Sequence, residues 1–332
     1  MPLRLGIVGT GNVARQQYLP FLSRQDDVEL MYLNRTRSKA DACAESFGGR
    51  VVDSVAGLVS AEPDAILVLT HETQRLAASR ALLDEKPRRL FFEKPLVARN
   101  GQANVCEDDF VDAREMLKRA RAAGTQTAMV FNYRFFDQTV RAQRIISERA
   151  FGPLRQASLF VNYACWSHCI DLLTLFGGRA TEIVAIEGST PYGAGNQRAV
   201  DVTACFRLAG GATGTIVGTS GTSFAFSLYE IYLSFEKGIV RFSDLDNGVE
   251  VFENGSPYAE RHDLVGSHGR SDQYDASFGK ALAAYLDTVR RAEPPPVPGI
   301  AGLEELQFEA ALRRAVAAKR PVDVQREFPL DA

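Results

Sequence analysis

This chain begins with a strand-like run that leads into a glycine-rich turn. Residues 5–8 are apolar and are followed by Gly9-Thr10-Gly11-Asn12-Val13-Ala14. Gly9 permits a tight turn, Gly11 lets the backbone approach a pyrophosphate, and Ala14 allows a helix to pack closely on a sheet. This order of strand, turn and helix predicts a dinucleotide site. Its expected binding residues are Gly9, Thr10, Gly11, Asn12 and Val13.

Strand and helix patterns alternate over roughly the first 125 residues. The expected strands, rich in Val, Ile, Leu and Phe, lie at residues 4–8, 29–33, 65–70, 89–92 and 126–131. The expected helices lie at residues 13–23, 39–47, 74–83 and 109–122. Strands that are apolar on both faces are typical of a parallel sheet covered by helices on both sides. We therefore expect a doubly wound α/β domain, of the Rossmann type, over residues 1–125.

The pattern changes in the rest of the chain. Strand-like segments occur at residues 157–162, 182–187, 201–207, 212–218, 227–234, 238–242 and 249–252, and several alternate apolar with polar residues. Such alternation is typical of an antiparallel sheet with one face in water. Helical patterns lie at residues 140–149, 167–176, 278–289 and 303–318. We expect residues 126–332 to form a second α/β domain with a mostly antiparallel sheet.

Composition narrows the classes of function. The net charge is −3, which favours neither nucleic acid nor an anionic membrane surface as a partner. No run approaches 18 apolar residues, and residues 1–14 lead directly into a strand rather than a secretory leader. Five scattered cysteines favour a reducing, cytoplasmic location. Cys165, His168 and Cys169 do not have a standard metal-ligand spacing, so buried thiols on a helix are the favoured interpretation.

The end of the second expected strand bears on the choice of nucleotide. Its sequence is Asn34-Arg35-Thr36-Arg37, with no carboxylate to bind the ribose 2′-hydroxyl of NAD. An arginine at this place can accommodate the 2′-phosphate that an aspartate would repel. We expect NADP(H) as the cofactor, with NAD possible, while a solvated basic turn is the alternative interpretation.

Glu93-Lys94-Pro95 closes another expected strand. Ligands of open α/β sheets bind at the carboxyl ends of the strands, so this tripeptide and the glycine turn should face one crevice. A lysine partly shielded from water there can transfer protons, and Glu93 can bond the ribose or amide of a nicotinamide nucleotide. Pro95 would fix the backbone, and a cis peptide bond is one way to do so. An ordinary ion-paired strand end is the alternative.

Two more candidates lie near the first helix of the second domain. His168 can reach an interdomain cleft and act as acid or base, although a lone histidine is more often structural. Asp171 lies one helical turn later, where it can orient the ring or bond backbone. Trp166 can be a core residue or a platform for substrate. Tyr163 joins Lys94 and His168 as the third candidate catalytic residue.

Four motifs follow one another in an order that resembles a known family. They are the glycine turn, Glu93-Lys94-Pro95, Asn132-Tyr133-Arg134-Phe135 and His168-x-x-Asp171-Leu172-Leu173. In this combination nearly the whole chain resembles the glucose–fructose oxidoreductase, inositol dehydrogenase and rhizopine-catabolism family (Gfo/Idh/MocA). The resemblance implies a Rossmann domain followed by a domain with a large, open, mostly antiparallel sheet. Homodimers or homotetramers would form through that sheet.

The resemblance also implies roles for individual residues. Lys94 would contact the substrate and the nicotinamide ribose, and His168 would bond the reacting oxygen. Residues 69–73 would run along the cofactor, which adds Thr70, His71 and Glu72 to the expected cofactor-binding residues. Arg134 in the third motif joins the same set.

Three departures from the family pattern put an inositol or glucose substrate in doubt. Ala164 stands where members that oxidise sugar alcohols commonly carry an aspartate, four residues before the histidine. The stretch from residue 152 to residue 168 is short, and the polar stretch 99–107 is long. Together they favour a different pocket, such as one for a keto-sugar nucleotide.

Three functions are compatible with these features. The first is an NADP(H)-dependent oxidoreductase that acts on a small polar carbonyl or alcohol, a sugar or sugar-nucleotide derivative in a biosynthetic pathway. The second is a reductase of C=N or C=C bonds with the same fold. The absence of an aspartate at Ala164 favours this function. The third is a regulatory protein that binds the dinucleotide without turnover, although such a protein needs neither Lys94 nor His168.

Overall fold

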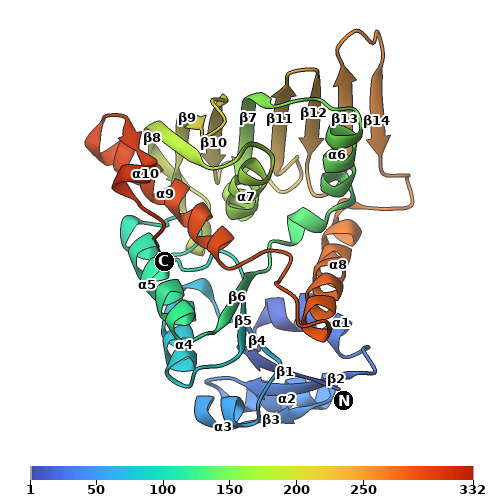
Figure 1. Ribbon diagram of the computed structural model, residues 1–332, viewed down its shortest axis with the longest axis vertical. Helices are drawn as coiled ribbons and strands as arrows, with labels where there is room; N and C mark the ends of the chain where they lie inside the picture. Colours follow the sequence, from blue (N-terminus) through green and yellow to red (C-terminus); the bar gives the residue numbers. More distant parts are fainter. Residues whose placement is uncertain (1, 332) are drawn as a thin grey trace.

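The computed structural model describes residues 2–331 and contains two β-sheets (Figure 1). The first has six strands, all parallel, in the order β3-β2-β1-β4-β5-β6. Its strands are β1 (Leu3–Val8), β2 (Val28–Leu33), β3 (Arg50–Val51), β4 (Ala65–Val68), β5 (Arg89–Phe92) and β6 (Gln126–Met129). This order is that of a doubly wound Rossmann sheet, so the fold class predicted for the first part of the chain is confirmed.

Helices connect these parallel strands, as the crossover rule requires. A continuous helical run covers residues 12–22, with a π-helical stretch η1 (Ala14–Tyr18) and then α1 (Leu19–Leu22). The others are α2 (Arg37–Phe47), α3 (Val55–Ser60), α4 (Glu72–Asp84) and α5 (Glu107–Ala122). All four residues of β4 are buried, as expected of a strand with helices over both faces.

The sheet extends one strand beyond the domain boundary predicted at residue 125. β6 pairs with β5 in parallel, from Arg89 opposite Gln126 to Phe92 opposite Met129. The apolar pattern at 126–131 predicted a strand, but the boundary put that strand in the second domain. Pairing with β5 places it in the first sheet, so the change of architecture comes after β6.

The second sheet has nine strands in the order β14-β13-β12-β11-β7-β10-β9-β8-β15. They are β7 (Leu154–Asn162), β8 (Ala180–Tyr192), β9 (Ala199–Leu208), β10 (Thr213–Thr219), β11 (Tyr229–Phe235), β12 (Gly238–Ser243), β13 (Gly248–Glu253), β14 (Ala259–Asp263) and β15 (Val322–Asp323). β7 and β10 are parallel, and the other neighbours are antiparallel. The prediction of a mostly antiparallel sheet is confirmed.

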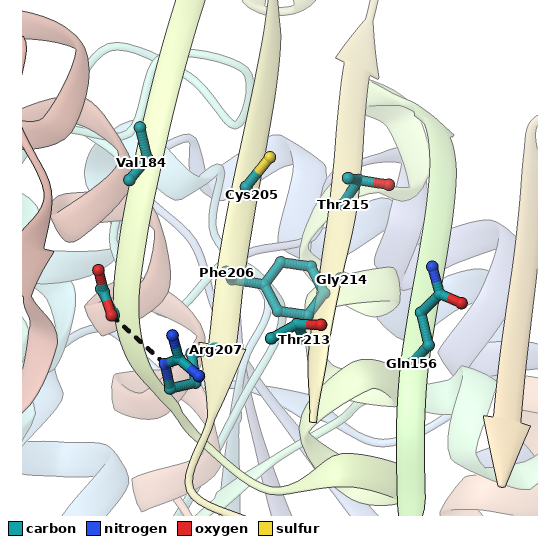
Figure 2. Close-up of a pocket in the computed structure, with 9 residues that line it drawn as sticks. Gln156, Val184, Cys205, Phe206, Arg207, Thr213, Gly214 and Thr215 are labelled. Atoms are coloured by element: carbon teal, nitrogen blue, oxygen red, sulfur yellow. Dashed lines mark hydrogen bonds and ion pairs between the residues drawn. The ribbon is translucent and has the colours of Figure 1, made fainter. Parts of the chain in front are cut away.

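One face of this sheet carries helices and the other is open. The helical segments of this part are η2 (Asn132–Phe135), α6 (Asp137–Glu148), η3 (Tyr163–Cys165), α7 (Trp166–Gly177), η4 (Gly195–Gln197), α8 (Arg270–Arg290), α9 (Ile300–Ala318) and α10 (Val324–Glu327). α7 packs on β7, and α9 packs on β8. A hollow of about 330 Å³ lies on the surface of this sheet. Val184, Cys205 and Thr215, labelled in Figure 2, line it from paired positions of β8, β9 and β10.

The last two long helices tie the sheets together. α8 contacts η1 and α1 of the first part of the chain, and α9 contacts α5 and β6 as well as α7 and β8 (Figure 1). Pro298, in the segment between α8 and α9, forms an isolated β-bridge with Ala128 of β6. The crevice between the two sheets is therefore held by helices that return from the far end of the chain. Within residues 2–331, no helix is long and apolar enough to cross a membrane.

Candidate functional site

Four strand ends meet at one edge of the first sheet. Val8 pairs with Leu33 on one side and with Val68 on the other, and Val68 pairs with Phe92. The loops that leave these strands therefore start side by side. The loops after β1, β4 and β5 form the floor of a cleft of about 460 Å³ that reaches up to the second domain, whereas residues 34–36 after β2 are not among its lining residues. Its walls are formed by Gly11, Asn12, Val13, Leu69, Thr70, His71, Glu72, Arg75, Glu93, Lys94, Gln102, Ala164, Gln197, Phe224, Tyr274 and Phe278.

The glycine turn has the shape that its sequence predicts. Gly9 has φ +95°, and a Cβ added there would lie 2.7 Å from the backbone nitrogen of Thr70, so only glycine fits. Thr70 also has a buried hydroxyl oxygen with no hydrogen-bond partner among residues 2–331. An unpartnered buried hydroxyl beside a glycine turn fits a site that a polar ligand completes.

The end of β2 is joined to the glycine turn by a side chain. Asn34 Oδ1 accepts a hydrogen bond from the backbone N–H of Thr10 at 3.1 Å, and its amide donates to the carbonyl of Thr36 at 3.0 Å. The two arginines differ in their surroundings. Arg37 is paired with Asp41 and Asp53 on the surface, whereas Arg35 is exposed and no described residue bonds to it. Arg35 is therefore free of the surface ion pairs that hold Arg37.

Glu93 is held firmly at the end of β5. Its Oε1 accepts from the Tyr18 hydroxyl at 2.7 Å, and its Oε2 accepts from the backbone N–H of Lys94 at 2.8 Å. Burial and the adjacent Glu93 charge raise the pKa of Tyr18 well above its usual value, so the phenol keeps its proton and donates. The Lys94–Pro95 peptide bond is cis, which confirms the option raised from the sequence.

Arg75 on α4 connects two of the cleft loops. Its guanidinium is buried and donates to the carbonyls of Thr70 and Glu93, each at 2.8 Å, and to the carbonyl of Pro95. A buried arginine that satisfies several backbone carbonyls fixes the path of the chain at low conformational freedom. Arg75 thus fixes the backbone from which the side chain of Lys94 projects.

The side chain of Lys94 crosses the cleft toward the second domain. Its ammonium donates to Gln102 Oε1 at 3.0 Å and to the backbone carbonyl of Ala164 at 3.3 Å. Both acceptors are uncharged, and no carboxylate in the described chain forms an ion pair with this ammonium. Lys94 is half-buried and lines the cleft. It is therefore a cation with incomplete compensation at the junction of the two domains.

His168 lies behind this junction. It is 2% exposed and stacks on the ring of Tyr133, with ring centroids 3.9 Å apart and planes 12° apart. Burial, and after it the positive charge of Lys94, lower the pKa of His168 well below its usual value, so the imidazole is neutral at neutral pH. Its Nδ1 has no hydrogen-bond partner within residues 2–331.

Asp171 takes neither of the two roles considered for it from the sequence, which were to orient the His168 ring or to bond backbone. Asp171 instead accepts two hydrogen bonds from Arg134, at 2.6 and 2.8 Å. A guanidinium and a carboxylate form a bidentate pair that a single ring N–H cannot match. Arg134 is thus occupied by this pair and is not among the residues that line the cleft.

Tyr163 and Trp166 belong to the interior. The Tyr163 hydroxyl donates to the carbonyl of Val200 at 2.9 Å, and burial raises the pKa of this phenol. Both side chains are 1% exposed and pack edge to face, with centroids 5.3 Å apart. Trp166 is therefore a core residue and not a substrate platform. Tyr163 is near Ala164 in sequence, but it does not line the cleft.

Cys165 and Cys169 are buried beside His168. The Sγ of Cys165 accepts from the Tyr133 hydroxyl at 3.2 Å, and burial raises the pKa of both thiols. In the part of the chain that the structure describes, no three His, Cys, Asp or Glu side chains are grouped so that they could hold a metal ion.

Comparison with protein families supports the cleft as a nucleotide site. Residues 3–131 match the sequence profile of the Gfo/Idh/MocA family, described as an oxidoreductase family with an NAD-binding Rossmann fold. The first part of the chain, residues 3–131, is thus similar to the NAD-binding Rossmann domain of the Gfo/Idh/MocA family. The match covers β1 to β6 and ends where the second architecture begins.

Individual relatives show how far the likeness extends. D-glucoside 3-dehydrogenase of Escherichia coli (strain K12) is 29% identical over 161 residues, 46% of this chain and 41% of that enzyme. This chain therefore matches about two fifths of the length of that relative. The WlbA dehydrogenase from Bordetella pertussis, solved with NADH and UDP-GlcNAcA, has a TM-score of 0.78 at 18% identity, over 97% of this chain and 99% of that one.

The same fold is also found in a structure solved for a super-repressor mutant. The super-repressor mutant of Gal80p from Saccharomyces cerevisiae has a TM-score of 0.82 at 13% identity and covers 100% of this chain and 99% of its own. At such identities the likeness of the solved structures concerns the fold alone.

Several cleft residues were missed from the sequence. They are Arg75, Gln102, Gln197, Phe224, Tyr274 and Phe278. Gln102 lies in the polar stretch 99–107. The unusual length of this stretch is the one feature of the sequence that could have indicated a residue of the cleft there. Tyr274 and Phe278 are one turn apart on α8, where their spacing indicates only a buried helix face.

Proposed function

We propose that this protein is an NADP(H)-dependent oxidoreductase of the Gfo/Idh/MocA family that transfers hydride to or from a small polar carbonyl or alcohol compound, a sugar or sugar-nucleotide derivative. The observation that carries the proposal is the ammonium of Lys94, which faces the cleft beside the glycine turn with only uncharged partners. A cation so placed can stabilise charge that develops on a substrate oxygen.

The residues of the cleft fit a dinucleotide. The turn from Gly9 to Val13 would hold the pyrophosphate, and Thr70, His71 and Glu72 would run along the cofactor. The unpartnered Thr70 hydroxyl supports this placement. Arg35, exposed and without a described partner, would bind a 2′-phosphate, which favours NADP(H) over NAD(H). The bound nicotinamide would supply or accept the hydride.

Lys94 is the proposed proton donor in the direction of reduction. Hydride addition to a carbonyl carbon leaves charge on the oxygen, and transfer of one proton from the ammonium completes the alcohol. His168 is less suited to be the main acid, because its lowered pKa leaves the ring neutral. A neutral imidazole can still hydrogen-bond the reacting oxygen. Glu93, held by Tyr18 and by the Lys94 backbone, keeps the lysine at the strand end.

The relatives support a sugar-like substrate. One is a D-glucoside 3-dehydrogenase, and another was solved with NADH and UDP-GlcNAcA. Ala164 brings only a backbone carbonyl to the place where an aspartate is common, so we expect a pocket that differs from that of the sugar-alcohol enzymes.

A homodimer or homotetramer through the open face of the second sheet is part of the proposal. That face exposes large apolar side chains, including Phe160, Ile186 and Tyr232. Exposed apolar side chains of this number on one face of a sheet are typical of a protein–protein interface. Sedimentation of the purified protein tests it, and a monomer at micromolar concentration would contradict it.

A turnover screen tests the proposed function. The purified protein is supplied with NADPH or NADH and with keto-sugars, keto-sugar nucleotides, imines and enones, and oxidation of the cofactor is followed. Turnover of a keto-sugar compound with NADPH is the expected result. Turnover of imines or enones alone would select reduction of C=N or C=C bonds. Tight NADPH binding without turnover of any compound would favour a regulatory protein.

A further inference from the structure

The long polar stretch 99–107 brings a side chain to the ammonium of Lys94. Gln102 Oε1 accepts from Lys94 Nζ at 3.0 Å, and Gln102 itself lines the cleft. The second acceptor is the backbone carbonyl of Ala164, the position where the family pattern has an aspartate. The nearest acid in sequence, Glu93, uses both carboxylate oxygens on Tyr18 and on the backbone N–H of Lys94.

The loop that carries Gln102 is anchored on both sides. Ala103, which follows Gln102, is fully buried, and its carbonyl accepts from Arg313 of α9 at 2.8 Å. The Asn104 amide donates to the carbonyl of Arg198 at 2.9 Å, which ties the loop to the second domain. At the start of the loop, the backbone N–H of Arg99 donates to Asp109 at 3.0 Å. The Gln102 side chain is thus presented by a backbone that is fixed before any ligand binds.

We propose that Gln102 is a positioning residue that orients the Lys94 ammonium with an uncharged acceptor in place of a carboxylate. The inference rests on the proposed role of Lys94 and adds a residue that none of the sequence motifs contains. A carboxylate beside an ammonium holds its proton more tightly, whereas an amide oxygen satisfies the donor without adding charge. Gln102 therefore directs the lysine toward the substrate and leaves its proton available for transfer.

The first test needs no substrate. Only the neutral amine of a lysine reacts with acetic anhydride, so the pH dependence of acetylation reports how tightly each lysine holds its proton. Trace acetylation is measured by mass spectrometry across pH for the wild type, Gln102→Glu and Gln102→Met. Lys118, exposed on α5, is the internal reference.

In Gln102→Glu we expect the half-maximal acetylation of Lys94 to move up by about 1 to 3 pH units, as an adjacent opposite charge does. In Gln102→Met, which keeps the length and removes the acceptor, we expect it to move down. Asp41→Asn, at an exposed position on α2, leaves the loop and the partners of Lys94 in place, and its Lys94 profile should follow the wild type. A Lys94 profile in folded Gln102→Glu that stays within about 0.3 pH unit of the wild type would overturn the proposal. If Gln102→Glu does not fold, an unchanged profile in Gln102→Met has the same meaning.

The second test uses turnover with the best substrate of the screen. We expect Gln102→Met to lower kcat by about ten-fold or more, since a hydrogen bond to a charged group is lost, with little change in the Kd for NADPH. In Gln102→Glu the limb of the pH–rate profile should move in the direction of the acetylation profile. If Lys94→Met loses activity but the acetylation and pH–rate profiles of the Gln102 variants do not move, the role of Gln102 is refuted and the role of Lys94 stands. Full activity in Lys94→Met would refute the proton donor of the proposed function, while the acetylation result would still stand.

Discussion

Two buried carboxyl groups on α9 should lower the free energy of unfolding of this protein as the pH rises. Glu305 and Glu309 are each 1% exposed. Burial raises the pKa of Glu309 to about 7, although Arg313 opposes the shift, and burial and the charge of Glu309 raise the pKa of Glu305 well above its usual value. The pair lies against Ser167 and Trp166 of α7, the helix that carries His168.

The size of the effect follows from the shift of Glu309. In the unfolded chain a glutamate has a pKa of 4.5, so above that pH the unfolded state loses a proton that the folded state keeps to about pH 7. The unfolded state binds fewer protons in this window, and the free energy of unfolding therefore falls as the pH rises. At 1.36 kcal/mol per pH unit, the loss amounts to about 3 kcal/mol and levels off above the folded pKa.

Glu309→Gln tests this reasoning, because glutamine has a similar shape and does not ionise. Urea unfolding of the variant and the wild type is measured at pH 5, 6, 7 and 8. We expect the difference in unfolding free energy to move in favour of the variant by about 2.5 kcal/mol between pH 5 and pH 8. Groups that do not interact with Glu309 cancel in this difference, whereas Glu305, whose pKa the charge of Glu309 raises, adds to it in the same direction. Glu115→Gln, at an exposed position on α5, is the control and should give a difference independent of pH. A change for Glu309→Gln of less than about 1 kcal/mol, or in favour of the wild type, would refute the reasoning.

The arginines at the end of β2 and the Arg134–Asp171 pair give two further expected outcomes. Arg35→Asp should weaken NADPH binding by several-fold to tens-fold and improve NADH binding, because a carboxylate repels the 2′-phosphate, whereas Arg37→Ala should change little since Arg37 is paired on the surface. Titration of cofactor fluorescence measures both, and tighter binding of NADH than of NADPH by the wild type would contradict the assignment. Asp171→Asn should lower the free energy of unfolding by about 3 kcal/mol because it leaves the half-buried Arg134 without its charged partner, while Asp41→Asn at an exposed pair should cost less than about 1 kcal/mol. Equal effects of the two asparagine variants in urea unfolding would show that burial of the pair does not matter.

Much of the fold could be predicted because its signals are local. The glycine turn and the apolar strands of the first sheet place β1, β2, β4, β5 and β6. The elements that were missed lack such signals. β14 is polar and mostly exposed at the edge of the second sheet, and β3 and β15 have two residues each. Their pairing depends on neighbours that a single strand's sequence does not reveal.

The candidate site was predictable only where one segment provides both the position and the chemistry. Lys94 follows a strand end, and strand ends of a parallel sheet meet at one edge, so its location followed from the pattern. The partners of Lys94 did not, since Gln102 reaches it through the path of a loop and Ala164 comes from the other domain. Helical spacing suggested that Asp171 serves His168, but an arginine 37 residues earlier in the chain forms the stronger bidentate pair.

The charge of Lys94 is the central claim of the proposed reaction, and Lys94→Met tests it most directly. Methionine keeps the length of the side chain and removes the ammonium. Single-turnover oxidation of bound NADPH by the best substrate of the screen is compared in the wild type and the variant, with the Kd for NADPH measured in parallel. We expect unchanged folding, similar NADPH binding and a hydride-transfer rate lower by about a hundred-fold or more. A rate close to that of the wild type would contradict the account and would leave proton transfer to His168 or to water.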